Sequence, residues 1–87
     1  MNKSTKKDSG TPSRHSEIHR AVGLNIAYYR KKEGMTQEQL AEKAGISWAY
    51  LSKIEAPNMA VNMSVDILFQ LADALRVAPT KLLDFRD

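Results

Sequence analysis

The segment from Ser47 to Glu55 carries the side chains best suited to binding another molecule. Its hydrophobic residues Leu51 and Ile54 fall on one helical face, so a second face is left for solvent. That outward face offers hydroxyl, indole and ammonium groups, at positions Ser47, Trp48, Ala49, Ser52 and Lys53. An exposed helix with such hydrogen-bonding, apolar and cationic side chains fits the major groove of DNA. The face therefore indicates a DNA-binding module.

The preceding residues predict a second short helix and a tight turn that would position this face. Small or apolar residues recur at helical spacing, at Leu40, Ala41, Ala44, Gly45, Ile46, Leu51 and Ile54. Two short helices that cross steeply over a turn need an inward face of this kind. Gly45 suits a left-handed backbone at the end of the first of them. Ala41 and Gly45 are also small where the two helices would come closest.

Start and stop signals extend this pattern to five predicted helices. These run over residues 16–33, 37–43, 47–55, 64–75 and 79–83. Ser16, Ser47 and Ser64 are expected to cap helices, while Thr36 and Gln39 form a capping box. Gly34 would end the first helix, and Pro79 would open the last one.

The hydrophobic pattern of the first and fourth helices predicts most of the core. The expected buried stripes are Ile18, Val22, Ile26 and Tyr29 in the first helix and Val65, Leu68, Leu71, Ala72 and Leu75 in the fourth. Alternating runs and hairpin dipeptides are absent from the sequence. We therefore predict an all-α protein with a compact five-helix fold.

Charge divides the 87 residues into a tail and one domain. Residues 1–15 carry the whole net charge of +3, whereas basic and acidic residues balance from Ser16 onward. The Ser, Thr, Lys, Gly and Pro content of residues 1–15 predicts a disordered basic N-terminal arm, with the folded domain over residues 16–87. The arm would be either a solvated tail or a contact to backbone phosphate or a minor groove.

Several classes of protein are disfavoured. Without cysteine there are no disulfides or thiolate metal sites, and His15 and His19 have no further ligands at the usual spacing. We therefore expect no metal and no cofactor. No serine has a plausible His and carboxylate arrangement, so we expect no enzyme. A bilayer-spanning run of roughly 20 apolar residues and a secretory signal are also lacking, which favours a cytoplasmic protein that is associated with the nucleoid when bound to DNA.

From about Val22 to Leu83 the chain resembles the Cro/repressor (XRE-like) helix-turn-helix family. The matching residues are Gly23, Ile26, Arg30, Thr36, Gln37, Leu40, Ala41, Ala44, Gly45, Ile46, Ser47, Leu51, Ser52, Lys53, Ile54, Glu55 and the run Leu71 to Leu75. The resemblance implies a lambda-repressor-like domain that usually works as a dimer on a partly palindromic operator. Its partner would be double-stranded DNA.

The resemblance also implies roles for individual residues. Gln37 would contact a phosphate, Trp48 and Ala49 would face base edges, and Ser52 and Lys53 would reach bases or backbone. The expected DNA-binding residues are Gln37, Ser47, Trp48, Ala49, Tyr50, Ser52, Lys53 and Asn58. For Tyr50 the alternative is to cover the edge of the core. Arg30 and Glu55 match a pair that forms a largely buried structural ion pair in the family.

Two departures from the family pattern affect the expected interface. Trp48 stands where a polar hydrogen-bonding residue is more usual. The run from Ala56 to Met59 replaces a basic, Gly-containing turn, and leaves Asn58 as the candidate phosphate partner there. Trp48 and Ala49 would therefore read the groove by apolar contact, for which thymine methyls are the natural partners.

The predicted function is a sequence-specific transcriptional regulator, namely a small dimeric repressor. A homodimer would use the end of the fourth helix, the last helix and residues 84–87. We expect no ligand-sensing domain after Asp87, so regulation would come from expression level, a protein partner or autoregulation. The alternative function is an antitoxin or a protein-interaction adaptor on the same fold, with Trp48 as an interface anchor.

Overall fold

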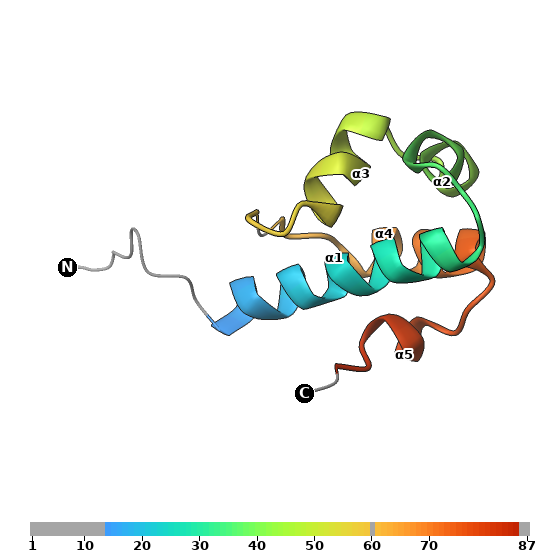
Figure 1. Cartoon of the computed structure of the whole chain (residues 1–87). Helices are drawn as coiled ribbons and strands as arrows, with labels where there is room; N and C mark the ends of the chain where they lie inside the picture. The colour runs from blue at the N-terminus through green and yellow to red at the C-terminus, as the bar shows by residue number, and fades with distance from the viewer. Residues whose placement is uncertain (1–13, 60, 86–87) are drawn as a thin grey trace.

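The structure, a computed structural model, describes residues 14–59 and 61–85. This part of the chain contains five helices and no strand, which confirms the predicted all-α class. The helices are α1 (Arg14–Lys32), α2 (Gln37–Ala44), α3 (Trp48–Glu55), α4 (Val65–Leu75) and α5 (Pro79–Leu82) (Figure 1). The predicted basic arm lies, except for Arg14 and His15, outside the described residues.

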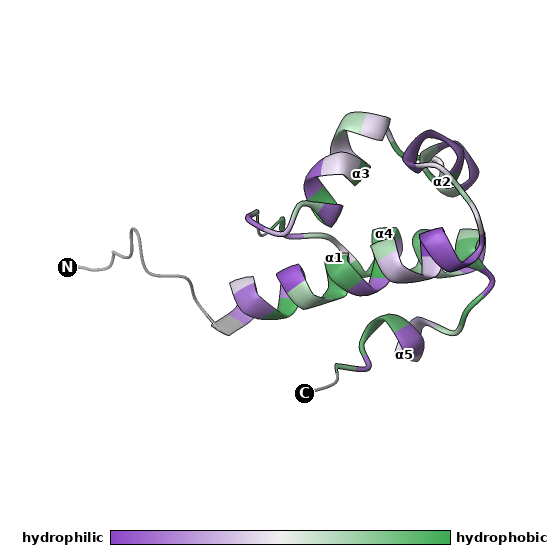
Figure 2. Ribbon diagram, in the orientation of Figure 1, coloured by the Kyte–Doolittle hydropathy of each residue, from purple (hydrophilic) through white to green (hydrophobic). Residues whose placement is uncertain are grey.

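The long helix α1 is the support against which three other helices pack. It crosses the middle of Figure 1, with α2 and α3 above it, α5 below it and α4 behind it. Helices α3, α4 and α5 all contact α1, and α2 packs against α3 and α4. Hydrophobic and hydrophilic residues alternate along α1 in Figure 2, as expected for a helix with a buried face and a solvated face.

Most helix boundaries are set by the predicted capping residues. Thr36 and Gln39 form a reciprocal capping box at the start of α2, and the Oγ atoms of Ser47 and Ser64 accept the N–H groups of Tyr50 and Ile67. Gly34 and Gly45 both have φ of 74°, in the left-handed region that glycine tolerates without a Cβ clash. These local signals were confirmed because each depends only on neighbouring residues.

Other predicted boundaries were wrong by one or two residues. Ser16 is not a cap, because α1 already begins at Arg14. Helix α2 continues to Ala44 until Gly45 ends it, and α5 ends at Leu82 rather than at Leu83. Asn25 of α1 donates hydrogen bonds from its amide to the carbonyl oxygens of Leu82 and Asp84, at 3.0 and 3.2 Å, and so holds the end of α5 against α1.

All five helices contribute to the core. Its buried hydrophobic residues are Val22, Ile26, Leu40, Ala41, Ala44, Leu51, Ile54, Leu71, Ala72, Leu75 and Leu82. Two predicted core positions were wrong: Val65 is 62 % exposed and Ile18 is 41 % exposed. Both lie near the start of a helix, in α4 and α1, where the helical period continues but the side chains stay partly exposed among the described residues.

Helices α1 and α3 approach each other closely at Gly23, where α1 passes the end of α3. A Cβ atom built on Gly23 would lie 1.9 Å from the carbonyl oxygen of Ile54, so no larger residue fits without moving the backbone. At Gly45, by contrast, a Cβ would meet only the Gln70 side chain, at 3.6 Å. Gly45 is therefore required for its backbone conformation, and the expectation that it is small because α2 and α3 approach there was wrong.

We predict that Gly23→Ala lowers the free energy of unfolding by about 2 kcal/mol net, because overpacking costs about 1–3 kcal/mol and the backbone obstacle here places the cost at the upper end. Helix propensity alone would give a gain of up to about 1 kcal/mol. Urea denaturation measures the difference. Ala27→Gly, on the same helix, is the control: its loss in the free energy of unfolding should not exceed the difference in helix propensity between alanine and glycine. A gain in stability for Gly23→Ala would contradict the close approach.

Candidate nucleic-acid interface

Helix α3 has one face buried in the core and another face whose side chains are exposed. Leu51 and Ile54 are buried in the core on its inward face. Trp48, Ala49, Ser52 and Lys53 are exposed, and Trp48 retains 55 % of its surface. The described residues that surround α3 therefore leave this outward face open. The exposed indole and ammonium group therefore stand on a helix whose inward face is held in the core.

Beneath this face lies the ion pair expected from the resemblance. Nε of Arg30 lies 3.2 and 2.9 Å from the two carboxylate oxygens of Glu55, and Nη2 lies 2.9 Å from Oε1. Glu55 is only 7 % exposed. The remaining guanidinium nitrogen of Arg30 donates to the carbonyl oxygen of Met35 at 2.8 Å. Arg30 thus ties α1 both to the end of α3 and to the turn before α2.

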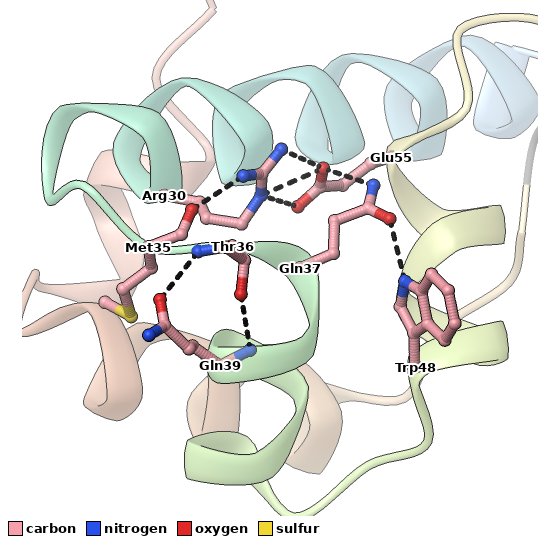
Figure 3. Close-up of polar contacts among 7 residues, drawn as sticks. All are labelled: Arg30, Met35, Thr36, Gln37, Gln39, Trp48 and Glu55. Atoms are coloured by element: carbon pink, nitrogen blue, oxygen red, sulfur yellow. Dashed lines mark hydrogen bonds and ion pairs between the residues drawn. The ribbon is translucent and has the colours of Figure 1, made fainter.

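Gln37 connects the ion pair with the exposed indole (Figure 3). Its Nε2 donates to Oε1 of Glu55 at 2.9 Å, and its Oε1 accepts the indole N–H of Trp48 at 3.1 Å. Both ends of the Gln37 amide are therefore engaged within the protein. In Figure 3 the N–H edge of the indole points toward Gln37.

This arrangement changes what Gln37 can offer to a phosphate. An amide nitrogen has two hydrogens, and the contact with Glu55 uses one of them. The second hydrogen and the backbone N–H groups at the start of α2 are the donors that remain for an anion. The phosphate role expected for Gln37 therefore requires it to hold a phosphate and Glu55 at the same time.

Three further residues of the expected interface differ in their surroundings. Ser47 is exposed, and its oxygen accepts the Tyr50 N–H at 3.0 Å, so its O–H can donate to another group without breaking the cap. Tyr50 is half-buried and packs against the core. Asn58 is exposed in the turn that follows α3. Tyr50 is accordingly the least available of these side chains for contact with another molecule.

The described residues contain no group of three or more His, Cys, Asp or Glu side chains that could hold a metal ion. None of the helices in the described residues is both long enough and apolar enough to cross a membrane.

The sequence and the fold both relate this chain to known proteins. Residues 26–82, from the middle of α1 to the end of α5, match the pattern of a family described as helix-turn-helix. The chain belongs to this helix-turn-helix family. It is 41 % identical over 63 residues to the transcriptional regulator SinR of Bacillus subtilis (strain 168), an alignment that covers 72 % of this chain and 56 % of SinR. The chain thus matches little more than half the length of that relative.

Solved structures agree with this assignment. A crystal structure of SinR in complex with DNA superposes with a TM-score of 0.67 at 41 % identity, covering 72 % of this chain and 98 % of the other. The restriction-modification controller protein C.AhdI of Aeromonas hydrophila gives a TM-score of 0.68 at 28 % identity, covering 74 % and 94 %. The predicted family and the predicted fold are therefore confirmed.

Sequence reasoning missed the connection that Gln37 makes between Trp48 and Glu55. The signal was present in the spacing, because Trp48 and Glu55 are the first and last residues of an eight-residue helix. Residues seven apart lie on the same helical face, so one side chain from α2 can reach both. The position of Gln37 directly after the capping residue Thr36 does not by itself show that its side chain bonds to Trp48 and Glu55.

We predict that Glu55→Ala lowers the free energy of unfolding by about 3–5 kcal/mol, because Arg30 would remain buried without its partner. Chemical denaturation at neutral pH measures the loss. In the double variant Arg30→Met with Glu55→Met, part of the stability should return, since neither charge is then stranded. Glu38→Ala on the exposed side of α2 is the control, with a change within about 0.5 kcal/mol. Equal losses for Glu55→Ala and Glu38→Ala would contradict the burial of the pair.

Proposed function

We propose that the outward face of α3 enters the major groove of a DNA duplex and that the chain regulates transcription by binding specific sequences. The observation that carries this proposal is the exposure of Trp48, Ala49, Ser52 and Lys53 on a helix whose opposite face is buried. A rigid helix of this kind can hold several side chains in register with base edges. The helix-turn-helix family and its relatives among transcriptional regulators support the same class of function.

Each exposed side chain contributes a different kind of contact. Trp48 and Ala49 supply apolar surface, for which the thymine methyl is the partner in the major groove. Lys53 is the long cationic donor of this face and reaches a guanine edge or a phosphate. Ser47, the second amide hydrogen of Gln37 and the N–H groups that begin α2 and α3 hold the DNA backbone. No catalytic chemistry is involved.

The folded part of the chain is formally neutral, so affinity for DNA depends on where its charges lie. Basic and acidic residues balance from Ser16 onward, and the excess of +3 belongs to residues 1–15. Lys53 therefore matters more here than a single lysine would in a strongly basic domain. Asn58 is the proposed backbone contact beyond the end of α3.

We predict that Lys53→Ala weakens DNA binding without unfolding the protein, because its side chain is exposed. The loss should be about 1–3 kcal/mol if Lys53 reaches a guanine edge. If Lys53 contacts a phosphate instead, the slope of log K against log salt should fall by about 0.9. Fluorescence anisotropy of a labelled duplex at several salt concentrations measures both quantities. Lys81→Ala, which removes the same charge from α5, is the matched control and should leave both unchanged.

We further propose that the protein is a homodimer, that it represses transcription, and that it is located in the cytoplasm. Leu83 and Phe85, which follow α5, are each 45 % exposed. Exposed apolar side chains of this kind could form the contact between two subunits. Two copies related by a two-fold axis would place two α3 helices in successive major grooves on one side of the duplex. A partly palindromic operator follows from this symmetry.

We predict that selection from a random DNA pool enriches two related half-sites that contain thymine, with centres about 10 base pairs apart. Sequencing of the bound fraction shows both the bases and the spacing. Enrichment of an isolated half-site would contradict the dimer but not the contact by α3. Absence of any enrichment would contradict the DNA-binding proposal itself.

The alternative is that the same face binds a protein, as an antitoxin or adaptor would. Its supporting observation is the exposed indole of Trp48, since tryptophan is a frequent anchor of protein interfaces. Trp48→Ala would then abolish capture of the partner while leaving duplex binding intact. Loss of duplex binding favours the regulator.

A further inference from the structure

The hydrogen bonds around Gln37 permit one orientation of its amide. The Glu55 carboxylate only accepts hydrogen bonds, and the indole nitrogen of Trp48 only donates them. The amide nitrogen of Gln37 must therefore face Glu55, and its oxygen must face Trp48, as the distances of 2.9 and 3.1 Å show. Rotating the amide by half a turn would place two acceptors together and two donors together.

The orientation is fixed from the buried side. Glu55 receives hydrogen bonds from Arg30 of α1 on both of its oxygens and is only 7 % exposed. Gln37 is the first residue of α2, and it bridges the first and last residues of α3. The position of the indole thus depends on three helices, whereas an exposed tryptophan on an isolated helix would rotate among several rotamers.

We infer that Gln37 is a positioning residue that holds Trp48 so that the indole ring carbons, and not its N–H group, meet the DNA. The ligand class read by Trp48 is therefore a 5-methylpyrimidine, recognised by apolar contact with the methyl group. This inference rests on the proposed function, because it concerns the same face of α3. It adds a role for Gln37 besides any contact with phosphate.

The chemistry follows from which parts of the indole remain available. An indole has a single donor and no acceptor, and Gln37 occupies that donor. Trp48 then has no hydrogen bond to give to a base edge. Its remaining exposed surface is aromatic carbon. Contact of this surface with the methyl group of a base is favourable, whereas contact with a polar base edge that lacks a methyl group is not. Thymine should thus be preferred to uracil, and 5-methylcytosine to cytosine, at the base that Trp48 meets.

A first experiment tests the positioning without DNA. Trp48 is the single tryptophan of the chain, so intrinsic fluorescence reports on it alone. In Gln37→Met, a side chain of similar length neither donates nor accepts, while Arg30 still pairs with Glu55. We predict a larger fast component in the time-resolved fluorescence anisotropy of Trp48. Gln70→Met is the matched control: it removes a hydrogen bond from Gln70 to the Ala44 carbonyl oxygen at the other end of α2, and should leave Trp48 unchanged.

A second experiment measures methyl recognition on the selected duplex, synthesised with thymine or with uracil at each thymine of one half-site. The unaltered protein should lose about fourfold in affinity at one position, the equivalent of about 0.8 kcal/mol for one apolar carbon. Gln37→Met should reduce this discrimination toward onefold. Trp48→Phe breaks the same hydrogen bond from the other side, so adding Gln37→Met to it should have no further effect on discrimination.

The two experiments separate the inference from the proposed function. Unchanged anisotropy in Gln37→Met overturns the positioning role, even if DNA binding is intact. Equal affinity for thymine and uracil at every position of the half-site overturns methyl recognition, again with DNA binding intact. Failure of the unaltered protein to bind any duplex overturns the proposed function, while the anisotropy result still reports on the contact between Gln37 and Trp48. If Gln37→Met does not fold, Gln37→Ala, which also removes both hydrogen bonds, takes its place, and the same two readouts support or overturn the inference.

Discussion

The buried carboxylate of Glu55 determines how α1, α2 and α3 are arranged around it. A carboxylate away from water needs its oxygens paired, and Arg30 and Gln37 provide the donors from two different helices. An ion pair of this kind often adds little net stability, because desolvation offsets the attraction between the charges. Its effect is instead on geometry: the end of α3, the turn before α2 and the last part of α1 satisfy one another only in this arrangement.

The hydrogen bonding of the Glu55 carboxylate also affects a side chain at the protein surface. Hydrogen bonds in a low-dielectric site are stronger than in water, and Arg30 and Gln37 bind the Glu55 carboxylate in such a part-buried site. The pairing continues from Glu55 through Gln37 to Trp48, which is more than half exposed. The orientation of this exposed side chain is thereby linked, through Gln37, to a buried carboxylate. Preorganisation of this kind lowers the entropy lost when a complex forms.

Much of the fold could be predicted from the sequence, because its helix ends depend on local chemistry. The caps at Thr36, Ser47 and Ser64 and the turn at Gly45 each act within a few residues. The failures at Ile18 and Val65 have a different cause: periodicity shows which residues share a face, but not how far the neighbouring helices extend over it. Coverage depends on the path of the whole chain.

The exposure of the candidate residues on α3 could be predicted from the sequence, but the hydrogen bonds between Gln37, Trp48 and Glu55 could not. The outward face of α3 follows from the positions of Leu51 and Ile54, which periodicity identifies. The engagement of Gln37 by both Trp48 and Glu55 depends on a contact between residues separated by 11 and 18 positions in the chain. The spacing of Trp48 and Glu55 indicates that they share a side of α3, but only the packed helices show that the Gln37 side chain reaches both.

The contact between Gly23 and the Ile54 carbonyl has a consequence for how such a protein can diversify. Backbone atoms meet backbone atoms there, so the separation of α1 and α3 is set by peptide van der Waals radii and not by side-chain volume. Mutations on the outward side of α3 can therefore accumulate without displacing the helix. The position of α3 is thus independent of the side chains on its outward face, which can change on an unchanged frame.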